Sequence, residues 1–449
     1  MAVANSARYQ DFMLLYSLGL LFVLLVTAPY WLLHMLLHEK YRAGLAERMG
    51  RVPRRVTDVL RGRRAIWVHA VSVGELIAVS GVVQALQQAH PEMGLVISTT
   101  TRTGQRLARS RFGDACVFYF PLDFSWILRR YLRALRPVLL VLAETEMWPR
   151  LLHEAHRAGV GIVVINGRIS DRSLPRYRWL RWLWCPFWSK LTRVLAQSEE
   201  DGQRFAAIGV PSDVIEVVGN LKYDVRAAQN MEITRRLRAA LPANAKVLVA
   251  GSTLEGEESM LLDAFEHESR QTPGLVLILA PRHPERFDAV ASLLERRNLP
   301  CARRSAWTKG NPKPLEPGSV FLLDSIGELA SVYALATVAF VGGSLVPAGG
   351  HNPLEPAQFG VPIMMGPHTQ NFRGVMEALM MDNAVAVAMP ENLAQTLHDL
   401  LTSPHAAEMG QRAYTVFEQQ AGATEQTLAV LESLLQAKES FTVQRSKTR

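Results

Sequence analysis

Short apolar runs recur along most of the chain, separated by stretches in which apolar residues follow helical spacing. The runs are rich in Val, Ile and Leu and are continuous rather than alternating, which is typical of strands buried on both faces of a parallel sheet. A first series comprises AIWVHA (65–70), GLVIST (94–99), CVFYF (116–120), VLLVLA (138–143), GIVVIN (161–166), RVLAQS (193–198) and IEVVGN (215–220). A second series comprises KVLVAGS (246–252), LVLILAP (275–281), SVFLLDS (319–325), TVAFVGG (337–343) and VPIMMG (361–366).

The two series are separated between residues 222 and 245, where the pattern lapses into polar, helix-prone sequence. This organisation predicts two α/β domains of the Rossmann type, which would form a cleft if they faced each other. We expect an N-terminal domain over residues 41–225 and a C-terminal domain over residues 226–425. Residues 426–449 are expected to form a helix followed by a basic tail.

The first 40 residues have a different pattern. Residues 12–37 contain no Asp, Glu, Lys or Arg and are long enough to span a bilayer. Nine basic residues follow between Lys40 and Arg64 and only Arg8 precedes, so the positive-inside rule places the rest of the chain in the cytoplasm. The run is too long for a signal-peptide core and lacks a small-x-small cleavage site, which indicates a membrane anchor. Pro29 and His34 leave open a helix that lies in the interface instead.

Composition and charge narrow the class of protein further. A chain of 449 residues with 49% hydrophobic and 20% charged residues is globular, not disordered. The three cysteines lie far apart without a CxxC or Cys/His cluster, so neither a disulfide framework nor a zinc site is indicated. A net charge of +8 suits an anionic partner, whether nucleic acid, a membrane surface or a phosphorylated substrate. The predicted anchor argues against nucleic acid.

Carboxylates follow two strands of the first predicted domain, where ligands of open parallel sheets bind. In VSVGEL, Glu75 opens a helix whose positive end favours the ionised carboxylate, and this suits a proton acceptor. In ETEMWP, an extended backbone would point Glu144 and Glu146 to the same side and raise the pKa of one of them. Two structural alternatives remain. Glu75 could simply stabilise the helix dipole, and Glu144 or Glu146 could form an ion pair or cap a helix.

Polar turns follow the strands of the second predicted domain as well. Ser252 in GST and Arg282 in APRHPERF should share one rim, and hydroxyl, guanidinium and backbone N–H groups bind phosphate. GGHNPLEP predicts a helix with Asn352 as N-cap, Pro353 as first residue and Glu355 closing a capping box, a start that can hold an anion. Together with the similar turn in DSIGEL, these features indicate a nucleotide pocket. No Walker A sequence occurs, and no Rossmann glycine pattern follows a strand.

Residues 176–193 combine four of the nine tryptophans with five basic residues. This composition is typical of a membrane interface, so we predict a second membrane contact there. A helix packed into the first domain with solvated arginines is the structural alternative. A nucleic-acid site is a third interpretation, against which the anchor argues.

Eight strings of the sequence, taken in order, resemble the lipid A Kdo transferases of Gram-negative bacteria: WVHAVSVGE, AETEMWP, INGRIS, AQSEED, GNLKYD, GSTLEGEE, APRHPERF and GGHNPLEPAQFGVPIMMGPHTQNF. The resemblance runs from Trp67 to Phe372. It implies a GT-B fold, two Rossmann-like domains with the active site between them. It also implies inverting transfer of Kdo (3-deoxy-D-manno-octulosonic acid) from CMP-Kdo to a tetraacylated lipid A precursor in lipopolysaccharide core assembly, with no metal or other cofactor.

The resemblance further implies roles for individual residues. Glu75 would be the general base, while Glu146 and Lys222 would stabilise the transition state; Glu144 is their neighbour, without an assigned role. Gln370 departs from the aromatic residue common at this place in the family, which leaves donor contacts of residues 368–372 open. The residues expected at the CMP moiety, with Ser252 added from its turn, are Ser252, Pro281, Arg282, Ile326, Gly327, Glu328, Asn352, Pro353, Leu354 and Glu355.

The expected partners are therefore CMP-Kdo, a lipid A precursor and the inner membrane, with the catalytic domains facing the cytoplasm and no nucleic acid bound. Two other hypotheses stay open: a GT-B transferase that uses another nucleotide sugar, and a membrane-tethered protein that binds lipid or carbohydrate without catalysis. The sequence leaves undecided how many Kdo units are transferred, which acyl chains are accepted and the oligomeric state.

Overall fold

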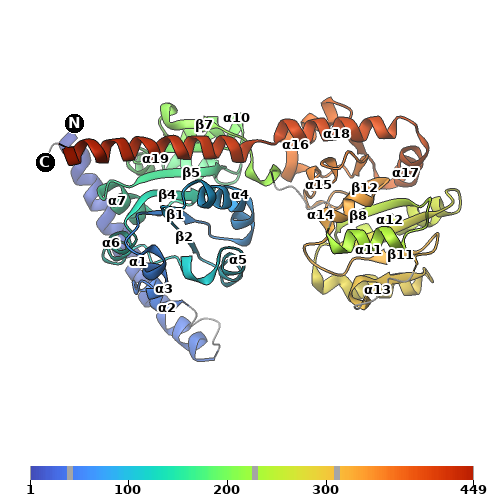
Figure 1. Ribbon diagram of the computed structural model, residues 1–449, viewed down its shortest axis with the longest axis horizontal. Helices are drawn as coiled ribbons and strands as arrows, with labels where there is room; N and C mark the ends of the chain where they lie inside the picture. Colours follow the sequence, from blue (N-terminus) through green and yellow to red (C-terminus); the bar gives the residue numbers. More distant parts are fainter. Residues whose placement is uncertain (1, 38–43, 225–230, 308–313, 448–449) are drawn as a thin grey trace. The chain divides into compact units, whose positions relative to one another are not determined.

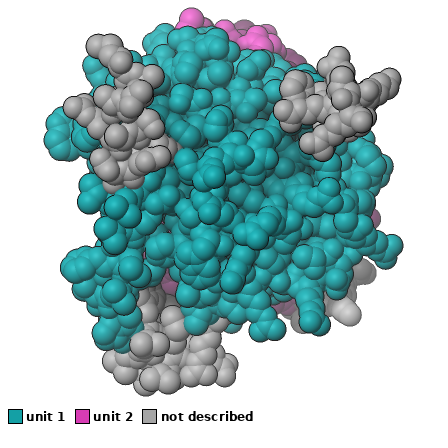
Figure 2. Space-filling model, turned by 90° about the vertical axis from the view of Figure 1, so that its left-hand side faces the viewer, with its two compact units in different colours: residues 1–225, 421–449 teal, residues 226–420 magenta. Residues whose placement is uncertain are grey.

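The computed structural model describes the chain except residues 1, 38–43, 225–230, 308–313 and 448–449. It divides into two compact units: unit 1 is residues 1–225 with 421–449, and unit 2 is residues 226–420 (Figure 2). Within the described residues, each unit contains one seven-stranded parallel sheet with helices on both faces (Figure 1). The predicted two-domain α/β architecture is confirmed.

The sheet of unit 1 has the strand order β3-β2-β1-β4-β5-β6-β7. Both faces are buried because successive side chains point to opposite sides: Trp67 enters one core, while Ile66 and Val68 enter the other. Its strands are β1 (Ala65–His69), β2 (Gly94–Thr99), β3 (Val117–Tyr119), β4 (Pro137–Ala143), β5 (Gly161–Gly167), β6 (Arg193–Ala196) and β7 (Ile215–Val217). Its helices are α1 (Ala2–Leu37), α2 (Leu45–Arg48), α3 (Arg54–Leu60), α4 (Val73–Ala89), α5 (Arg102–Phe112), α6 (Ser125–Leu135), α7 (Pro149–Arg157), α8 (Leu174–Trp179), α9 (Arg181–Trp188), α10 (Glu199–Ile208) and α19 (Ala423–Lys447).

The C-terminal helix α19 packs on unit 1, although the chain reaches it only after completing unit 2. Leu431 and Leu435 are buried in the same core as the α4 side chains. The Asp224 carboxylate accepts the backbone N–H of Gly422 at 2.7 Å and also that of Thr424 at the start of the helix. The helix continues to Lys447, through residues that were expected to form a tail.

The sheet of unit 2 has the order β10-β11-β9-β8-β12-β13-β14. The short edge strands β10 and β14 were not predicted, because CAR and AV are too short to form an apolar run. The strands are β8 (Lys246–Thr253), β9 (Leu275–Pro281), β10 (Cys301–Arg303), β11 (Val320–Leu322), β12 (Val338–Val341), β13 (Ile363–Met365) and β14 (Ala386–Val387). The helices are α11 (Glu232–Ala240), α12 (Glu257–Ser269), α13 (Phe287–Arg296), α14 (Leu329–Val332), α15 (Leu354–Ala357), α16 (Arg373–Met381), α17 (Leu393–Thr402) and α18 (Ala406–Gln420).

The strand order reverses between β1 and β4 in unit 1 and between β8 and β12 in unit 2, where β10 in addition lies outside β11 at the edge of the sheet. Doubly wound sheets bind their ligands beyond the carboxyl ends of the strands at such a switch point. Glu75 follows β1 and Glu144 follows β4, whereas Ser252 lies near the end of β8 and a glycine-rich loop follows β12. The fold therefore brings Glu75 and Glu144 to the switch point of unit 1, and Ser252 and the glycine-rich loop to the switch point of unit 2.

Candidate active site

Glu75 lies in the first turn of α4, and hydrogen bonds tie its carboxylate to the start of that helix. The backbone N–H of Val71 donates to Oε2 at 2.7 Å, and the Ser72 hydroxyl donates to Oε1 at 2.8 Å. Ser72 accepts the Glu75 N–H in return and thereby caps the start of α4. Burial nevertheless raises the pKa of Glu75 against these hydrogen bonds, so desolvation outweighs the expected effect of the helix end. The result is a strengthened base held in one orientation.

Glu144 and Glu146 lie in a turn after β4, not in the extended segment that the sequence predicted. Glu144 has a φ of 56°, in the left-handed region, so strand alternation does not relate the two side chains. Lys222 Nζ donates to Glu144 Oε1 at 2.8 Å. Burial first, then the nearby Glu75 and Glu144 carboxylates, raise the pKa of Glu146 to about 7. The neighbouring carboxylates therefore raise the pKa of one glutamate, as expected, although the backbone that carries them is not extended.

This group of side chains, Glu75, Glu144, Glu146 and Lys222, is called the acidic cluster below. Like charges held close together disfavour full ionisation, and Glu146 accordingly retains a proton up to about pH 7. The cluster thus combines a base, a neutral hydrogen-bond donor and an ammonium group. These are the groups that proton abstraction from a hydroxyl and stabilisation of the resulting charge require.

In unit 2, the loop of residues 342–353 is shaped by its glycines. A Cβ at Gly342 would lie 2.4 Å from the carbonyl oxygen of Ser252, so only glycine permits this approach. Gly350 N–H donates to Gly343 O at 2.7 Å, and His351 N–H donates to Gly342 O at 3.0 Å, which folds the loop back on itself. Asn371 anchors it from outside, since its side chain donates to Ala348 O at 3.0 Å.

The helix start predicted at NPLE differs from the observed one. Asn352 Oδ1 accepts the Leu354 N–H at 3.0 Å, as a cap does, but α15 begins only at Leu354 and Pro353 precedes it. The capping box predicted for Glu355 is wrong, because no hydrogen bond described for the structure joins its carboxylate to the Asn352 backbone. Burial instead raises the pKa of Glu355 to about 7, while the Arg282 guanidinium acts to lower it. Glu355 therefore faces the predicted donor residues.

The other predicted donor residues divide into two groups. Ser252, Pro281 and Arg282 are adjacent, since Thr253 pairs with Pro281 between β8 and β9 and the Arg282 N–H donates to Thr253 O at 3.0 Å. The positive charges of Arg282 and His283 lie near His351 and, with burial as the larger cause, lower the pKa of His351 to about 4.

The turn of Ile326, Gly327 and Glu328 follows β11 and forms the second group. Arg304 binds the Glu328 carboxylate through two nitrogens, each at 2.9 Å from an oxygen, and Ser325 binds it as well. Gly327 has a φ of 90°, and the Ile326 side chain is exposed. Glu328 is therefore held by protein groups, and the structure does not bring it to Glu355.

Comparison with known proteins shows which family carries these residues. A family model described as 3-deoxy-D-manno-octulosonic-acid transferase (kdotransferase) matches residues 43–225. The 3-deoxy-D-manno-octulosonic acid transferase of Haemophilus influenzae is 35% identical over 404 residues, which cover 88% of this chain and 92% of that protein. The chain belongs to the 3-deoxy-D-manno-octulosonic acid (Kdo) transferase family. It is therefore an enzyme, a glycosyltransferase. The Bordetella pertussis enzyme of the same name is 36% identical over 386 residues, covering 82% and 87% of the two chains.

Solved structures are similar to this Kdo transferase as well. The C-terminal CMP-Kdo binding domain of WaaA from Acinetobacter baumannii is 37% identical and covers 39% of the chain and 90% of that domain, with a TM-score of 0.36. A UDP-GlcNAc 2-epimerase from Neisseria meningitidis covers 83% of the chain and 100% of its own, with a TM-score of 0.57 at 13% identity. The second likeness extends over both units and concerns the fold alone, which is of the GT-B class.

Sequence reasoning did not single out Glu257, in the first turn of α12. Its fully buried carboxylate accepts four backbone N–H groups: those of Leu254 and Gly343 on Oε2 at 2.8 and 2.7 Å, and those of Ser344 and Leu345 on Oε1 at 2.9 Å each. Three of these donors open the glycine-rich loop of the Kdo transferase. Glu257 therefore fixes the entrance to that loop, and its position after a glycine at a helix start was the one indication in the sequence.

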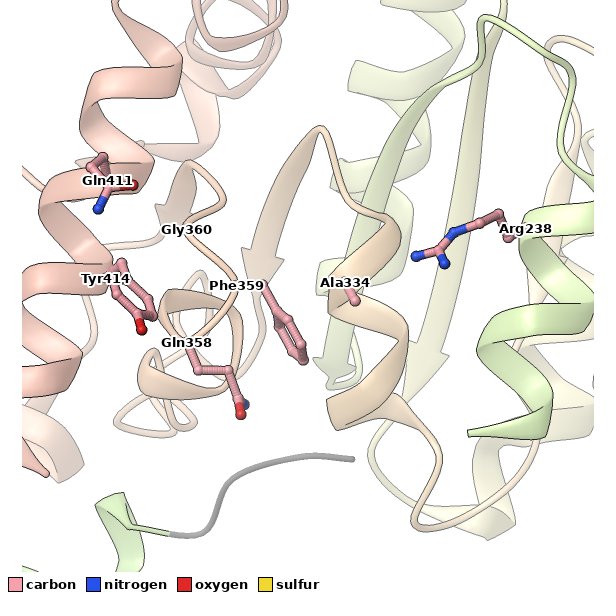
Figure 3. Close-up of a pocket in the computed structure, with 7 residues that line it drawn as sticks. All are labelled: Arg238, Ala334, Gln358, Phe359, Gly360, Gln411 and Tyr414. Carbon is pink, nitrogen blue, oxygen red and sulfur yellow. The ribbon is translucent and has the colours of Figure 1, made fainter. Parts of the chain in front are cut away.

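A hollow of about 440 Å³ in unit 2 lies away from these residues (Figure 3). Arg238 and Ala334 line it from segments that lead into β8 and β12, and Gly360 lines it just before β13. These positions mark the amino ends of the strands, opposite to the switch point. The hollow is therefore not the site formed by Ser252 and Arg282.

Proposed function

We propose that this enzyme transfers Kdo from CMP-Kdo to a lipid A precursor in lipopolysaccharide assembly, with inversion at the anomeric carbon. The acidic cluster at the switch point of unit 1 is the observation that carries the proposal. Glu75, oriented by Val71 and Ser72 and strengthened by burial, accepts the proton of the attacking hydroxyl.

In the proposed step, the acceptor oxygen forms a bond to the anomeric carbon of Kdo while its proton passes to Glu75. The bond from that carbon to the CMP phosphate oxygen breaks, and CMP leaves as an anion without a general acid. Lys222 and protonated Glu146 stabilise the charge that develops in the transition state. A single base at the attacked face is what inversion requires.

Unit 2 binds the CMP moiety in this proposal. Arg282 and the backbone N–H groups of the glycine-rich loop suit the phosphate, and the Glu355 carboxylate suits the vicinal hydroxyls of ribose. The turn after β11 would contribute less directly, since its glutamate is bound by Arg304. The full set proposed is Ser252, Pro281, Arg282, Ile326, Gly327, Glu328, Asn352, Pro353, Leu354 and Glu355.

We also propose that α1 attaches the enzyme to the cytoplasmic side of the inner membrane, where a lipid acceptor lies. Among the described residues one helix is long and apolar enough to cross a membrane, over Phe12–Tyr30 with a mean hydropathy of 2.2. The segment of residues 176–193 divides in two: Trp179 and Trp182 are exposed, while Trp188 is buried in the core of unit 1. The buried part agrees with a helix packed into the first domain, and the exposed tryptophans support the proposed membrane contact.

The direct test combines the purified full-length enzyme with CMP-Kdo and a lipid A precursor and follows the products by mass spectrometry. We expect CMP release and an acceptor whose mass has increased by one or more Kdo units. The number of units added is read from the same spectrum. Absence of any heavier acceptor, with an enzyme that is folded and binds CMP, would contradict the proposed reaction.

Nucleotide preference is tested by thermal unfolding. CMP at a hundred times its dissociation constant should stabilise the protein by about 2.7 kcal/mol, whereas UMP should have a smaller effect. Arg282→Ala should remove most of the CMP effect, while the matched change Arg412→Ala, at a half-buried position on α18 outside the predicted donor residues, should not. Stronger protection by UMP would favour a transferase that uses a different nucleotide sugar.

Glu355→Gln should change stability and ligand affinity in opposite directions. Because the folded-state pKa of Glu355 is raised to about 7, its contribution to stability is present below the ordinary pKa of 4.5 and is lost as pH rises through 7. The variant should therefore unfold at a higher temperature than the wild type at pH 8, with no gain at pH 4. CMP affinity should fall, because an amide offers one acceptor oxygen instead of two. Unchanged CMP affinity, measured by calorimetry, would contradict the ligand role.

A further inference from the structure

The N-terminal half of the apolar helix α1 is bound to the rest of unit 1. The Tyr16 hydroxyl donates to Asp123 Oδ2 at 2.9 Å, and Arg150 Nε donates to Ser17 Oγ at 2.8 Å. Arg150 also donates to the carbonyl oxygen of Met13, whose side chain is 4% exposed and belongs to the core of unit 1. These four residues, Tyr16, Ser17, Asp123 and Arg150, are called the clasp.

The clasp is built into the fold of unit 1 and is not a chance surface contact. Asp123 is 2% exposed, and its carboxylate also accepts the backbone N–H groups of Arg150 and Leu151 at 2.9 and 2.8 Å, in the first turn of α7. Phe12 packs its ring edge-on against Phe187 of α9, with 5.7 Å between the centroids. Figure 1 shows α1 running past the α7 side of unit 1. The clasp therefore holds α1 at a fixed place on the unit.

The chain that follows α1 is bound to the same unit. Glu47 of α2 accepts the Tyr119 N–H at 2.7 Å, and the Tyr131 hydroxyl donates to the Glu47 carbonyl at 2.9 Å. Gly44 is so close to Tyr119 that a Cβ would lie 2.0 Å from the ring. Seven residue steps separate Leu37 from Gly44, which reach at most about 25 Å.

The clasp and the contacts of Gly44 and Glu47 together limit the orientations that α1 can adopt in a bilayer. The hydrocarbon core is about 30 Å thick, and a helix that crossed it would place Leu37 on the opposite side from the clasp. The chain would then have to cross the core again to reach Gly44, which about 25 Å of chain cannot do. Two of the clasp residues, Tyr16 and Ser17, also lie inside the apolar window of Phe12–Tyr30 itself. A spanning α1 is therefore incompatible with the contacts of unit 1.

The face of α1 turned away from the clasp is apolar and exposed. Six large side chains on it are between 52% and 67% exposed and recur at helical spacing: Leu14, Leu15, Leu18, Phe22, Leu25 and Val26. The elements that flank the clasp carry exposed tryptophans: Trp126 on α6, with Arg130 5.4 Å from its ring, and Trp179 and Trp182 on α8 and α9. Exposed tryptophans beside arginines are typical of the headgroup layer of a membrane. These features suit contact with an anionic lipid leaflet.

We propose that α1 lies within one leaflet of an anionic phospholipid membrane, with its N-terminus on the same side as unit 1, and that the clasp orients the unit against that leaflet. The inference rests on the proposed membrane attachment and goes beyond it. Of the two anchors that the sequence leaves open, it selects the one that does not span. The clasp then holds unit 1 in a fixed orientation relative to the leaflet, which a flexible linker after α1 would not do.

Topology is tested with a cysteine at position 6, Ser6→Cys, in a full-length variant in which Cys116, Cys185 and Cys301 are replaced by alanine. A membrane-impermeant maleimide should label this cysteine in inverted inner-membrane vesicles and leave it unlabelled in intact spheroplasts. Ser110→Cys, on α5 of unit 1, is the control and should behave identically. Labelling of position 6 in intact spheroplasts would overturn the inference. Loss of the protein from the membrane fraction would overturn the attachment itself.

The orienting role of the clasp is tested with the double change Tyr16→Phe and Ser17→Ala, which leaves the exposed apolar face unchanged. Transfer to an acceptor embedded in phosphatidylglycerol-containing vesicles should fall by at least about fivefold, which corresponds to one of the two ordinary hydrogen bonds that the change removes. Transfer to detergent-dispersed acceptor should stay the same. The control Tyr30→Phe makes the same chemical change in α1 outside the clasp. An equal loss in both assays, or none in either, would overturn the role; a wild type inactive in both would instead contradict the proposed reaction.

Discussion

Glu75→Gln is expected to lower Kdo transfer by about 10²- to 10⁴-fold, the usual contribution of a general base. The amide oxygen can still accept the Val71 N–H or the Ser72 hydroxyl, so the start of α4 keeps most of its capping and the protein stays folded. CMP binding, which we propose for unit 2, should be unchanged. Initial rates and CMP calorimetry on the same preparation check the two expectations together.

Ser72→Ala is the control for the structural part of this effect. It removes the hydroxyl that caps α4 and should cost about 1 kcal/mol of stability while leaving the base in place. Its rate should therefore fall far less than that of Glu75→Gln. Retention of more than a tenth of wild-type activity by Glu75→Gln would rule out Glu75 as the base.

The pH dependence of the rate should identify the base independently. Only ionised Glu75 accepts a proton, so the rate falls as pH drops through its pKa. The Glu144 carboxylate raises and the Lys222 ammonium lowers this pKa. Glu144→Gln should therefore move the acid limb of the profile to lower pH, and Lys222→Met should move it to higher pH. Shifts in the same direction would show that the limb belongs to another group.

The strands and the class of fold could be predicted from the sequence because their information is local. Continuous apolar runs at strand length identified the buried strands, and the carboxyl-end rule then selected the turns that carry the candidate site residues. The two missed strands are edge strands of two and three residues, too short for an apolar run. Glu144 was placed in an extended backbone because a left-handed φ is uncommon for glutamate and leaves no mark in the sequence.

Contacts between segments that lie far apart in the chain could not be predicted from the sequence. Tyr16 and Ser17 look like minor polar positions in an apolar helix, because their partner side chains follow more than 100 residues later. The capping box predicted for Glu355 failed for a related reason. Its carboxyl is buried close to Arg282, which lies more than 70 positions earlier in the chain, and the sequence of the helix start does not reveal this. A first-turn glutamate such as Glu257 is indistinguishable by sequence from one that serves only the helix dipole.

Glu257→Gln is expected to have the second largest effect, on both the stability of unit 2 and the binding of CMP. The carboxylate offers two acceptor oxygens to four buried N–H groups, and glutamine would place an NH₂ donor against two of them. Each buried N–H left unpaired costs about 1–3 kcal/mol, so a loss of at least about 2 kcal/mol follows. Because three of the four donors open the glycine-rich loop, its geometry should loosen as well.

The matched control is Glu266→Gln, on the same helix, where the carboxylate is partly exposed and pairs with Arg297. We expect a clear drop in unfolding temperature for Glu257→Gln and little change for Glu266→Gln, since exposed ion pairs contribute at most about 1 kcal/mol. Calorimetry below the unfolding transition should show at least tenfold weaker CMP binding for Glu257→Gln alone. Weaker stability with unchanged CMP affinity would show that Glu257 supports the fold without setting the donor loop. Equal changes in unfolding temperature and CMP affinity for the two variants would show that the four hydrogen bonds to Glu257 contribute no more than the ion pair of Glu266.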